Sequence, residues 1–303
     1  MKLFITGATG YIGGSLAATL VQQGHEVAGL ARSEEKARGL SSRGITPAIG
    51  TLFSTATIRA AVQQVDAVVN AADSDNAYVA ADLLEAMQGT GKTLLHISGS
   101  SIVGDRARGA ASEVVWHDTD SLAPRLEKRG RWAIDRAILE AGERGLRSIV
   151  ICPSMVYGRG LGERPDSVQV PTLQRLAAAE GRGIYLGPGL NVWSTVHIED
   201  LVQLCLLALD HAPGGTFCFA ENGEVRLRDL SEAIAAGLGL PDGARSMSME
   251  SAVERLGAGA AEFSLASNSR VRATRARTTL GWRPRHDDLI AGVRDGRYLA
   301  RPS

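Results

Sequence analysis

The sequence predicts an α/β protein built on a doubly wound parallel sheet. Short apolar segments of strand length recur along the first half of the chain, and amphipathic segments of helical length separate them. A glycine-rich turn joins the first of these strands to the first helix. Strands that alternate with helices favour a parallel sheet, in which ligands bind beyond the carboxyl ends of the strands. We therefore look for function in the loops that follow the strands.

The glycine turn is the most informative of these loops. The strand Leu3–Ile5 precedes it, a helix is expected from Tyr11, and Gly7, Gly10 and Gly13 give the spacing Gly-x-x-Gly-x-x-Gly. The first glycine permits a tight turn, the second lets backbone approach a phosphate, and the third lets the helix pack closely on the strand. The helix N-terminus adds partial positive charge. A turn with no ligand has the same glycines, but the preceding strand and the following helix favour a dinucleotide site.

Five further segments are predicted as strands of the same sheet, and two helices are expected between them. The strands are expected at 26–31, 45–49, 67–72, 93–97 and 148–152, and the helices at 57–64 and 76–87.

The end of the second strand predicts which dinucleotide binds. An acidic residue there accepts hydrogen bonds from the ribose of NAD, whereas a basic residue accommodates the 2′-phosphate of NADP. This sequence has Arg32 at that point, with Ser33 and Lys36 beside it. An Arg–phosphate contact stabilises a complex by about 1.5–3 kcal/mol, or about ten- to a hundredfold in affinity. We expect NADP rather than NAD, although a solvated Arg32 before a helix that begins at Ser33 is the alternative.

Composition narrows the class of partner and the compartment. Lys plus Arg and Asp plus Glu both number 33, so no net field favours nucleic acid or an anionic membrane. No apolar run reaches the roughly 18 residues of a membrane span, and no signal peptide is evident. Cys152, Cys205 and Cys218 lie in apolar segments without C-x-x-C pairing, as is typical of buried thiols. We expect a cytoplasmic protein with a small-molecule substrate and no metal site.

Several motifs together resemble those of the extended short-chain dehydrogenases/reductases, the NAD(P)-dependent epimerase/dehydratase family. They are Thr6-Gly-Ala-Thr-Gly-Tyr-Ile-Gly13, Asn70-Ala-Ala72, Pro153-Ser-Met-Val-Tyr-Gly158, Val196-His-Ile-Glu-Asp200 and Leu280-Gly-Trp282. The resemblance spans nearly the whole chain and indicates a superfamily rather than a substrate. It implies a Rossmann-type domain at 1–165, to which 190–210 returns, and a smaller mixed substrate-binding lobe at 166–303. It also implies a possible homodimer through helices at 76–88 and 131–143.

The resemblance assigns cofactor contacts to the loops after the strands. For the phosphates and the adenosine these are Gly7, Thr9, Gly10, Tyr11, Ile12, Gly13, Arg32, Ser33, Leu52, Ala71 and Ala72. For the nicotinamide side they are Ser98, Pro153, Ser154, Met155 and Val156.

The family's catalytic residues are only partly matched. The family places a Ser or Thr after the fifth strand and a Tyr-x-x-x-Lys on the next helix, where the Lys lowers the pKa of the Tyr. Alignment on Gly104 puts Gly99 at the Ser position, so Ser98 or Ser100 would serve through a loop shift; the alternative is a serine turn that touches only the cofactor. The expected helix aligns with Glu127 at the Tyr position and Arg131 at the Lys position.

A guanidinium does not give up its proton near neutral pH, so Arg131 is expected to hold the nicotinamide ribose rather than to act as an acid. Glu127 is an alternative acid or base, or else a solvated residue before the helix. Tyr157 and His117, the latter in Trp116-His117-Asp118, are further candidates for proton transfer, with packing and solvated loop positions as their alternatives. We expect His197 and Asp200 to be structural, with Asp200 beginning a helix over 201–209.

The C-terminal half offers fewer candidates. Asn191 and Trp193 follow a glycine-rich loop and can face the substrate cleft. Arg270, Arg272, Arg275 and Arg277 form either an anion site or, as we prefer, a solvated helix face.

These observations predict an atypical NADP-dependent oxidoreductase that acts on a small carbonyl or alcohol. The alternatives are a nucleotide-sugar epimerase or dehydratase and a non-catalytic NADP-binding redox sensor.

Overall fold

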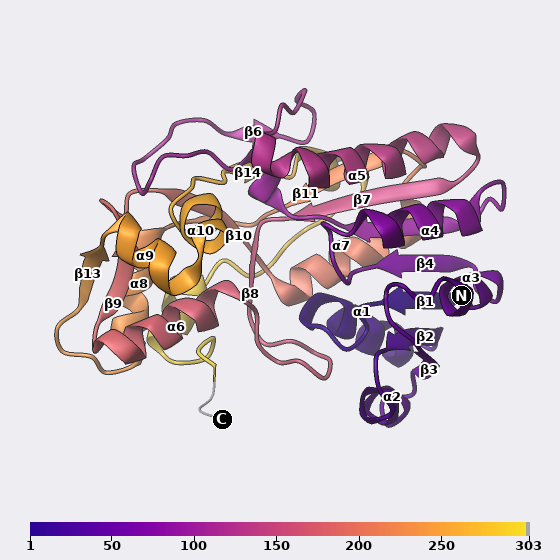
Figure 1. Cartoon of the computed structure of the whole chain (residues 1–303), viewed down its shortest axis with the longest axis horizontal. Helices are drawn as coiled ribbons and strands as arrows, with labels where there is room; N and C mark the ends of the chain where they lie inside the picture. Colours follow the sequence, from indigo (N-terminus) through magenta and orange to yellow (C-terminus); the bar gives the residue numbers. More distant parts are fainter. Residues whose placement is uncertain (301–303) are drawn as a thin grey trace.

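The computed structural model describes residues 1–300, and its centre is a seven-stranded parallel sheet in the order β11-β7-β5-β4-β1-β2-β3 (Figure 1). Every neighbouring pair is parallel. The prediction of a doubly wound parallel sheet is therefore confirmed. The strands are β1 (Lys2–Thr6), β2 (Glu26–Ala31), β3 (Thr46–Ile49), β4 (Ala67–Asn70), β5 (Thr93–Ile97), β7 (Arg147–Pro153) and β11 (Thr216–Ala220).

Helices cover both faces of the sheet (Figure 1). On one face α1 (Tyr11–Gln22) packs against α7 (Ile198–His211), and α2 (Glu34–Ser41) packs on β2 and β3. On the other face α3 (Thr55–Gln63), α4 (Ala77–Met87) and α5 (Arg129–Glu140) lie side by side. Three 3₁₀ turns, at Ser100–Val103, Leu126–Lys128 and Ala141–Arg144, flank α5 and the end of β5. A homodimer through α4 and α5 stays a prediction.

A smaller half, with its own apolar core, packs beside the sheet (Figure 1). Its strands are β8 (Met155–Tyr157), β10 (Val192–His197) and β12 (Glu224–Arg226) in one sheet and β9 (Gly183–Leu186) with β13 (Ala244–Met247) in another. Its helices are α6 (Gln169–Glu180), α8 (Leu227–Gly237), α9 (Met249–Leu256), α10 (Ala258–Ala260), a π-turn at Ala261–Leu265 and α12 (Leu289–Arg294). A short parallel pair, β6 (Trp116–His117) with β14 (Val271–Arg272), and the helix α11 (Thr274–Thr279) pack against the larger core, where β14 and α11 contact β11.

Two details differ from the sequence-based expectations. The strand β11 was not expected, and it pairs with β7, so more of the C-terminal half joins the central sheet than the segment 190–210. Trp282, which belongs to the segment 166–303 expected to form the smaller lobe, also lies in the larger core. The helix after β10 begins at Ile198 with His197 as its N-cap, so Asp200 lies inside the first turn rather than at its start. The division of the chain at residue 165 stays a prediction.

The glycine turn depends on the absence of side chains. Gly7 has φ +75°, and a β-carbon built on it would lie 2.6 Å from the Ala71 carbonyl oxygen. A β-carbon on Gly13 would lie 2.4 Å from the Gly7 carbonyl oxygen. Because real β-carbons do not approach backbone so closely, both positions require glycine. The turn therefore brings β1, α1 and the end of β4 together at one edge of the sheet.

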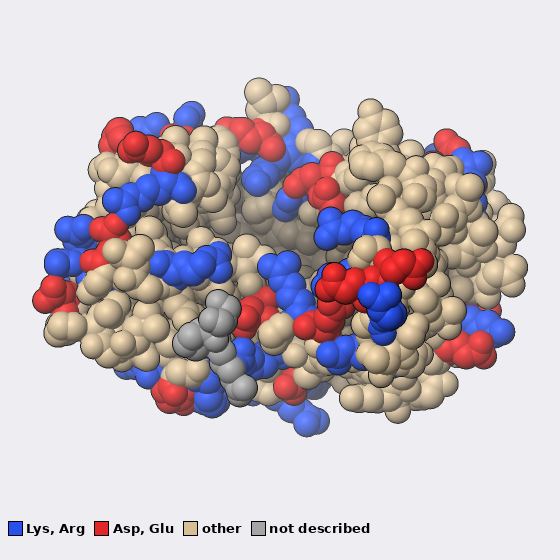
Figure 2. Space-filling view, turned by 60° about the horizontal axis from the view of Figure 1, so that its bottom comes forward, with Lys and Arg blue, Asp and Glu red and all other residues tan. Residues whose placement is uncertain are grey.

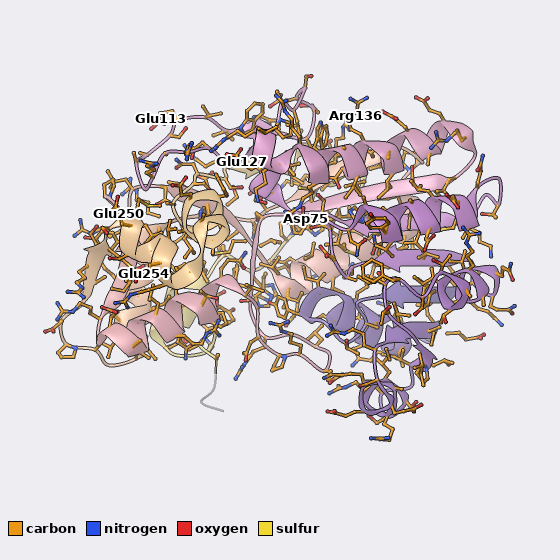
Figure 3. The ribbon with its side chains drawn as sticks, viewed as in Figure 1. Asp75, Glu113, Glu127, Arg136, Glu250 and Glu254 are labelled. Carbon is orange, nitrogen blue, oxygen red and sulfur yellow. The ribbon has the colours of Figure 1, made fainter. Side chains whose placement is uncertain are left out.

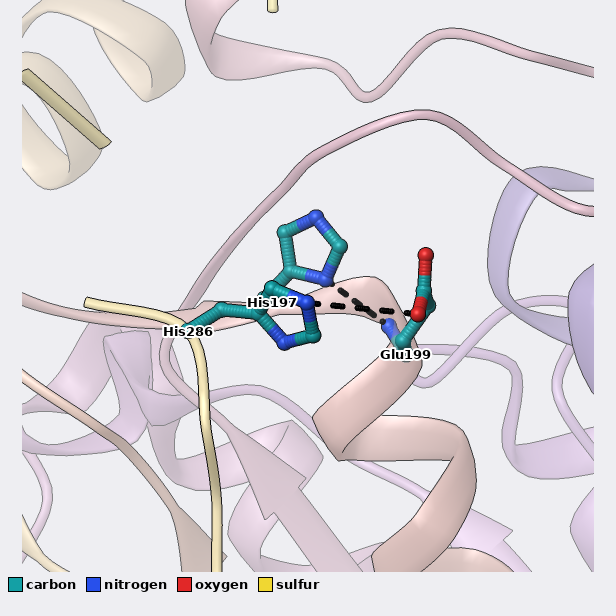
Figure 4. A group of neighbouring side chains, drawn as sticks. All are labelled: His197, Glu199 and His286. Atoms are coloured by element: carbon teal, nitrogen blue, oxygen red, sulfur yellow. Dashed lines mark hydrogen bonds and ion pairs between the residues drawn. The ribbon is translucent and has the colours of Figure 1, made fainter. Parts of the chain in front are cut away.

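A histidine cluster joins α7 to the C-terminal segment (Figure 4). The Glu199 backbone N–H donates to His197 Nδ1 at 3.3 Å, and His286 stacks on His197 with ring centres 4.0 Å apart. The Asp200 carboxylate accepts the backbone N–H groups of Arg285 and His286 at 3.0 and 2.9 Å. Two imidazoles stacked face to face do not direct their nitrogens at one point, so the group formed by His197, Glu199 and His286 suits packing better than metal coordination.

The cluster gives a pH dependence of stability with a defined sign. Burial, and then the neighbouring His286, lower the pKa of His197 to about 4, against about 6.5 in an unfolded chain. Between these two values the unfolded state binds a proton that the folded state does not. Stability from this group is thus complete above about pH 6.5 and is lost as the pH falls toward 4, by up to roughly 3 kcal/mol.

We expect His197→Asn to remove that part of the pH dependence, because an Asn oxygen can still cap α7 but does not titrate in this range. Urea unfolding at several pH values between 4 and 7 measures the effect, with His211→Asn, an exposed site at the end of the same helix, as the matched control. Equal slopes of unfolding free energy against pH in the wild type and His197→Asn would contradict the assignment.

Candidate functional site

The predicted cofactor residues form one row along the carboxyl edge of the sheet. In the order of the strands, Pro153 ends β7, Ser98 follows β5 and Ala71 follows β4. The glycine turn then follows β1, and Arg32 follows β2. Ser33 caps α2, and Leu52 lies in the turn after β3. The order of the chain reverses between β1 and β4, which is where open α/β sheets form their ligand crevice.

A cavity of about 380 Å³ lies at the β5–β7 end of this row. Tyr11 and Ile12 line it from the glycine turn, Ser98 and Ser100 from the loop after β5, and 153–156 from the end of β7. The smaller half closes the other side with Trp193 and Phe263, among others. Figure 2 shows a hollow between the two halves of the molecule, with charged side chains of both signs on its rim. The structure thus brings residues from both halves to one cavity.

The segment 158–168 leads from β8 to α6 and is tied to α1 and α2. The Tyr11 hydroxyl donates to the Gly158 carbonyl at 2.9 Å, and the Leu161 N–H donates to Ser15 Oγ at 3.0 Å. Glu163 forms an ion pair with Lys36 of α2. Ser167 and Val168, at the end of the segment, line the cavity. Lys36 is thereby engaged within the protein, while Arg32 remains exposed at the end of β2.

The serines after β5 have different partners. Ser98 Oγ donates to the buried carboxylate of Asp135 at 2.6 Å. The Ser100 and Ser269 hydroxyl oxygens lie 2.8 Å apart, and Ser269 also donates to the Ser100 carbonyl. Ser101, which the sequence analysis did not select, accepts a hydrogen bond from Arg131 at 2.8 Å. All three of the loop serines line the cavity.

Arg131 is held by a carboxylate from the loop after β4. Its Nε and Nη2 donate to the two oxygens of Asp75 at 2.9 and 2.5 Å, and this pairing lowers the pKa of Asp75. Figure 3 shows Asp75 near the end of α4 that faces the smaller half. A β-carbon built on Gly99 would lie 3.1 Å from Arg131 Nη1. Gly99 therefore leaves the space that the bulky guanidinium uses.

Lys128 lines the same cavity and was missed by the sequence analysis. It lies one residue beyond the position aligned with the family's Tyr, so a search confined to that alignment passes over it. Burial, and then the charge of Arg131, lower the pKa of Lys128, and no ion pair to Lys128 occurs within residues 1–300. A half-buried ammonium without an ion-pair partner attracts an anion more strongly than a solvated one does.

Glu127 does not line this cavity. It is exposed, its carboxylate pairs with Arg125 at 2.5 Å, and Figure 3 shows it near the start of α5. Hydrogen bonding to its own backbone N–H, and then the Arg125 charge, lower its pKa. These contacts favour a carboxylate that stays ionised, and they argue against Glu127 as a proton donor.

Tyr157 and His117 are also kept away from the cavity. Tyr157 is fully buried in the smaller core, donates to the His286 carbonyl at 3.1 Å, and has a pKa raised by burial. His117 lies in β6 with its Nδ1 3.2 Å from Thr274 Oγ1. The structure therefore does not bring either candidate, Tyr157 or His117, to the site, because each belongs to an element that packs elsewhere.

Of the two candidates that follow the glycine-rich loop, one lines the cavity and the other does not. Trp193 lines the cavity and donates from its indole to the Ser267 carbonyl, whereas Asn191 is fully buried and donates to the carbonyls of Leu265 and Ser267.

The expected Arg-rich face is neither an anion site nor simply solvated. Arg270 and Arg272 pair with Glu224, Arg277 pairs with Glu221, and the Arg275 N–H is accepted by Asp118.

The fold and the row of strand-end residues define a Rossmann-type nucleotide-binding protein. The model of the NAD dependent epimerase/dehydratase family matches residues 3–218, and the chain belongs to this family. Within residues 1–300, no helix combines the length and the apolar character that a membrane crossing requires. Cys152, Cys205 and Cys218 are buried free thiols, as expected.

Individual relatives extend over nearly the whole chain. An uncharacterised protein of Schizosaccharomyces pombe is 30% identical over 99% of this chain and 100% of its own length. The 2-alkyl-3-oxoalkanoate reductase of Stenotrophomonas maltophilia is 26% identical over 85% of this chain and 82% of its own. The structure of dTDP-glucose 4,6-dehydratase from Bacillus anthracis in complex with NAD superimposes with a TM-score of 0.75 over 97% of this chain and 94% of its own, at 17% identity. These similarities support an oxidoreductase or epimerase with a nicotinamide cofactor.

Proposed function

We propose that this protein is an NADP-dependent oxidoreductase that reduces a small carbonyl compound or oxidises the corresponding alcohol. The observation that carries the proposal is the continuity of the row along the carboxyl edge, from Arg32 through the glycine turn to the cavity beside Ser98. A dinucleotide laid along that row has its adenosine at β2 and its nicotinamide at β7. The cytoplasm, suggested by the buried free cysteines, stays the predicted compartment.

The residues present fit such a cofactor. Gly7 and Gly13 have no room for a β-carbon, and the turn that they form leads into the N-terminus of α1, whose backbone N–H groups can bind a pyrophosphate. Ala71 offers a small side chain after β4, and 153–156 offers a wall for the nicotinamide. When bound, NADPH supplies a hydride to the carbonyl carbon of the substrate. The protein then has to hold that carbonyl in the cavity and provide a proton for its oxygen.

Arg32 is the proposed contact to the 2′-phosphate. It is exposed at the end of β2, while its basic neighbour Lys36 is paired with Glu163. A guanidinium can donate two parallel hydrogen bonds to a phosphate. NAD, without this phosphate, would not use the contact.

We expect Arg32→Ala to weaken NADPH binding by about ten- to a hundredfold while leaving NADH binding within about twofold. Cofactor fluorescence titration of the purified protein measures both affinities. Arg38→Ala, on the neighbouring helix α2, is the matched control. Tighter binding of NADH than NADPH by the wild type, or an unchanged NADPH affinity in Arg32→Ala, would overturn the choice of NADP.

The lining of the cavity favours an anionic carbonyl substrate. Nine serines line the cavity, and among the described residues no Asp or Glu does. Lys128 places a positive charge there, and the nearby Asp75 forms its ion pair with Arg131 rather than with Lys128. Serine hydroxyls and an ammonium suit a compound that combines a ketone with a carboxylate. The name of the S. maltophilia relative specifies an oxoalkanoate, which has this combination, and it supports the same class for this chain.

We expect Lys128→Met to raise the KM for 3-oxoalkanoates about tenfold or more and to leave the KM for their methyl esters within about twofold, because the esters have no charge to pair. NADPH consumption measures both, and Glu127→Gln is the adjacent control. An equal rise in the KM for the acids and for the esters would contradict the proposal of an anionic substrate. Bound NADPH with no consumption across a broad carbonyl panel would instead favour the redox sensor.

A further inference from the structure

A line of buried polar side chains runs beneath the cavity, across three adjacent strands. Thr6, Asn70 and His96 stand opposite one another in the pairing of β1, β4 and β5. Thr6 Oγ1 donates to Asn70 Oδ1 at 2.7 Å, and Asn70 Nδ2 lies 3.1 Å from His96 Nδ1. All three residues are at most 1% exposed. Polar groups buried this deeply in an otherwise apolar sheet are costly unless they are satisfied.

The line ends on a carboxylate beneath the substrate cavity. Asp135 of α5 is fully buried, and its Oδ2 accepts the Ser98 hydroxyl at 2.6 Å. Its other oxygen, Oδ1, faces His96 Nε2 at 3.4 Å. These two facing atoms, Nε2 and Oδ1, are buried without any closer hydrogen-bond partner. Ser98 is the one member of the line that also lines the cavity.

The donors and acceptors give the line a direction. The Asn70 amide nitrogen can only donate, so His96 Nδ1 accepts from it and His96 holds its proton on Nε2, facing Asp135. Ser98 donates its single proton to Asp135, which leaves its oxygen lone pairs for a partner in the cavity. A substrate hydroxyl is a suitable donor to those lone pairs.

We propose that Asp135, acting through Ser98 and positioned by His96, exchanges the proton with the substrate oxygen, in place of the absent tyrosine. This inference rests on the proposed oxidoreductase function and identifies how its proton is handled. Ser98 would be the catalytic residue, and Asp135 and His96 would be positioning residues that act through it.

The proton balance is complete in both directions. In oxidation the alcohol O–H proton passes to Ser98 Oγ, the Ser98 proton passes to Asp135, and the hydride leaves the alcohol carbon for NADP⁺. In reduction the hydride from NADPH reaches the carbonyl carbon, Ser98 gives its proton to the carbonyl oxygen, and Asp135 returns a proton to Ser98. Reduction therefore needs one more proton on the Asp135–His96 pair at the start than oxidation does.

Charged and titratable groups from α5 and β7 lie close to Asp135 and Ser98. Arg131 lies one turn before Asp135 on α5, and Cys152 of β7 lies beside Ser98. Burial, and then the Asp135 charge, raise the pKa of the Cys152 thiol well above its usual range, so that thiol stays protonated and does not compete for the role. Arg131 stays positively charged and forms an ion pair with Asp75.

Asp135→Asn is the sharpest test, because Asn keeps the shape and the acceptor for Ser98 but cannot take a proton. We expect kcat to fall about a hundredfold or more, with KM and NADPH affinity within about twofold. In the wild type, reduction should weaken at high pH and oxidation at low pH, and Asp135→Asn should flatten both limbs. Ser98→Ala should match it, and Glu140→Gln, exposed on the same helix, should behave as wild type.

A second readout needs no turnover. Nitrogen-15 NMR of the imidazole of His96 in the cofactor-free protein should show the proton on Nε2, with a resonance that moves in Asp135→Asn and stays in Glu140→Gln. A proton on Nδ1, or a resonance unaffected by Asp135→Asn, would overturn the proposal. Wild-type kcat and pH profiles in Ser98→Ala and Asp135→Asn would overturn it while leaving the oxidoreductase intact. No turnover by wild type that binds NADPH would overturn both.

Discussion

The close approach of backbone at Gly7 is the constraint on which the site depends. A side chain there would collide with the Ala71 carbonyl, and one at Gly13 would collide with Gly7 itself. Because these contacts are between backbones, the ends of β1 and β4 and the start of α1 are fixed relative to one another. The rest of the carboxyl edge is then positioned by parallel pairing outward from β1 and β4. The glycine turn and the cavity beside Ser98 are thus two parts of one edge.

The end of that edge beside β5 and α5 differs from the family pattern at two positions that contact each other. Where the resemblance places a serine the chain has Gly99, and where it places a lysine the chain has Arg131. The structure connects the two, because the guanidinium occupies space that a larger residue at 99 would need, and Asp75 holds it there. This end of the cavity therefore holds a permanent cation, which Asp75 and Ser101 fix in place. A guanidinium does not give up its own proton near neutral pH, so on our proposal another group exchanges the proton with the substrate.

The sequence predicted those parts of the structure that local chemistry determines. The glycine turn, the strand ends and the helices expected at 57–64 and 76–87 follow from residue type and periodicity, and they lie within two residues of where they were expected. The strand at 216–220 was not expected, since five residues after Gly215 have no period of their own and pair only because β7 is adjacent. Long-range packing decides such cases.

The same distinction applies to the candidate site: positions set by local sequence were predictable, and positions set by packing were not. Ser98 and Ser100 come from the loop after β5, which a parallel sheet places at its carboxyl edge, and Arg131 comes from the first turn of α5. All three line the cavity. Lys128 and Asp135 required three-dimensional information. Lys128 lies in the 3₁₀ turn before α5, and Asp135 is a polar residue that is buried beside Ile134 and Ile138 of that helix. Tyr157 has suitable chemistry, but the smaller core buries it. Residue type alone did not reveal that.

A crystal structure of the complex with NADPH would show where each part of the cofactor binds. We expect the 2′-phosphate at Arg32, the pyrophosphate at the glycine turn, and the nicotinamide in the cavity, with its reactive carbon facing the space beside Ser98. A nicotinamide that lies outside this cavity, or a cofactor bound away from the glycine turn, would contradict this expectation.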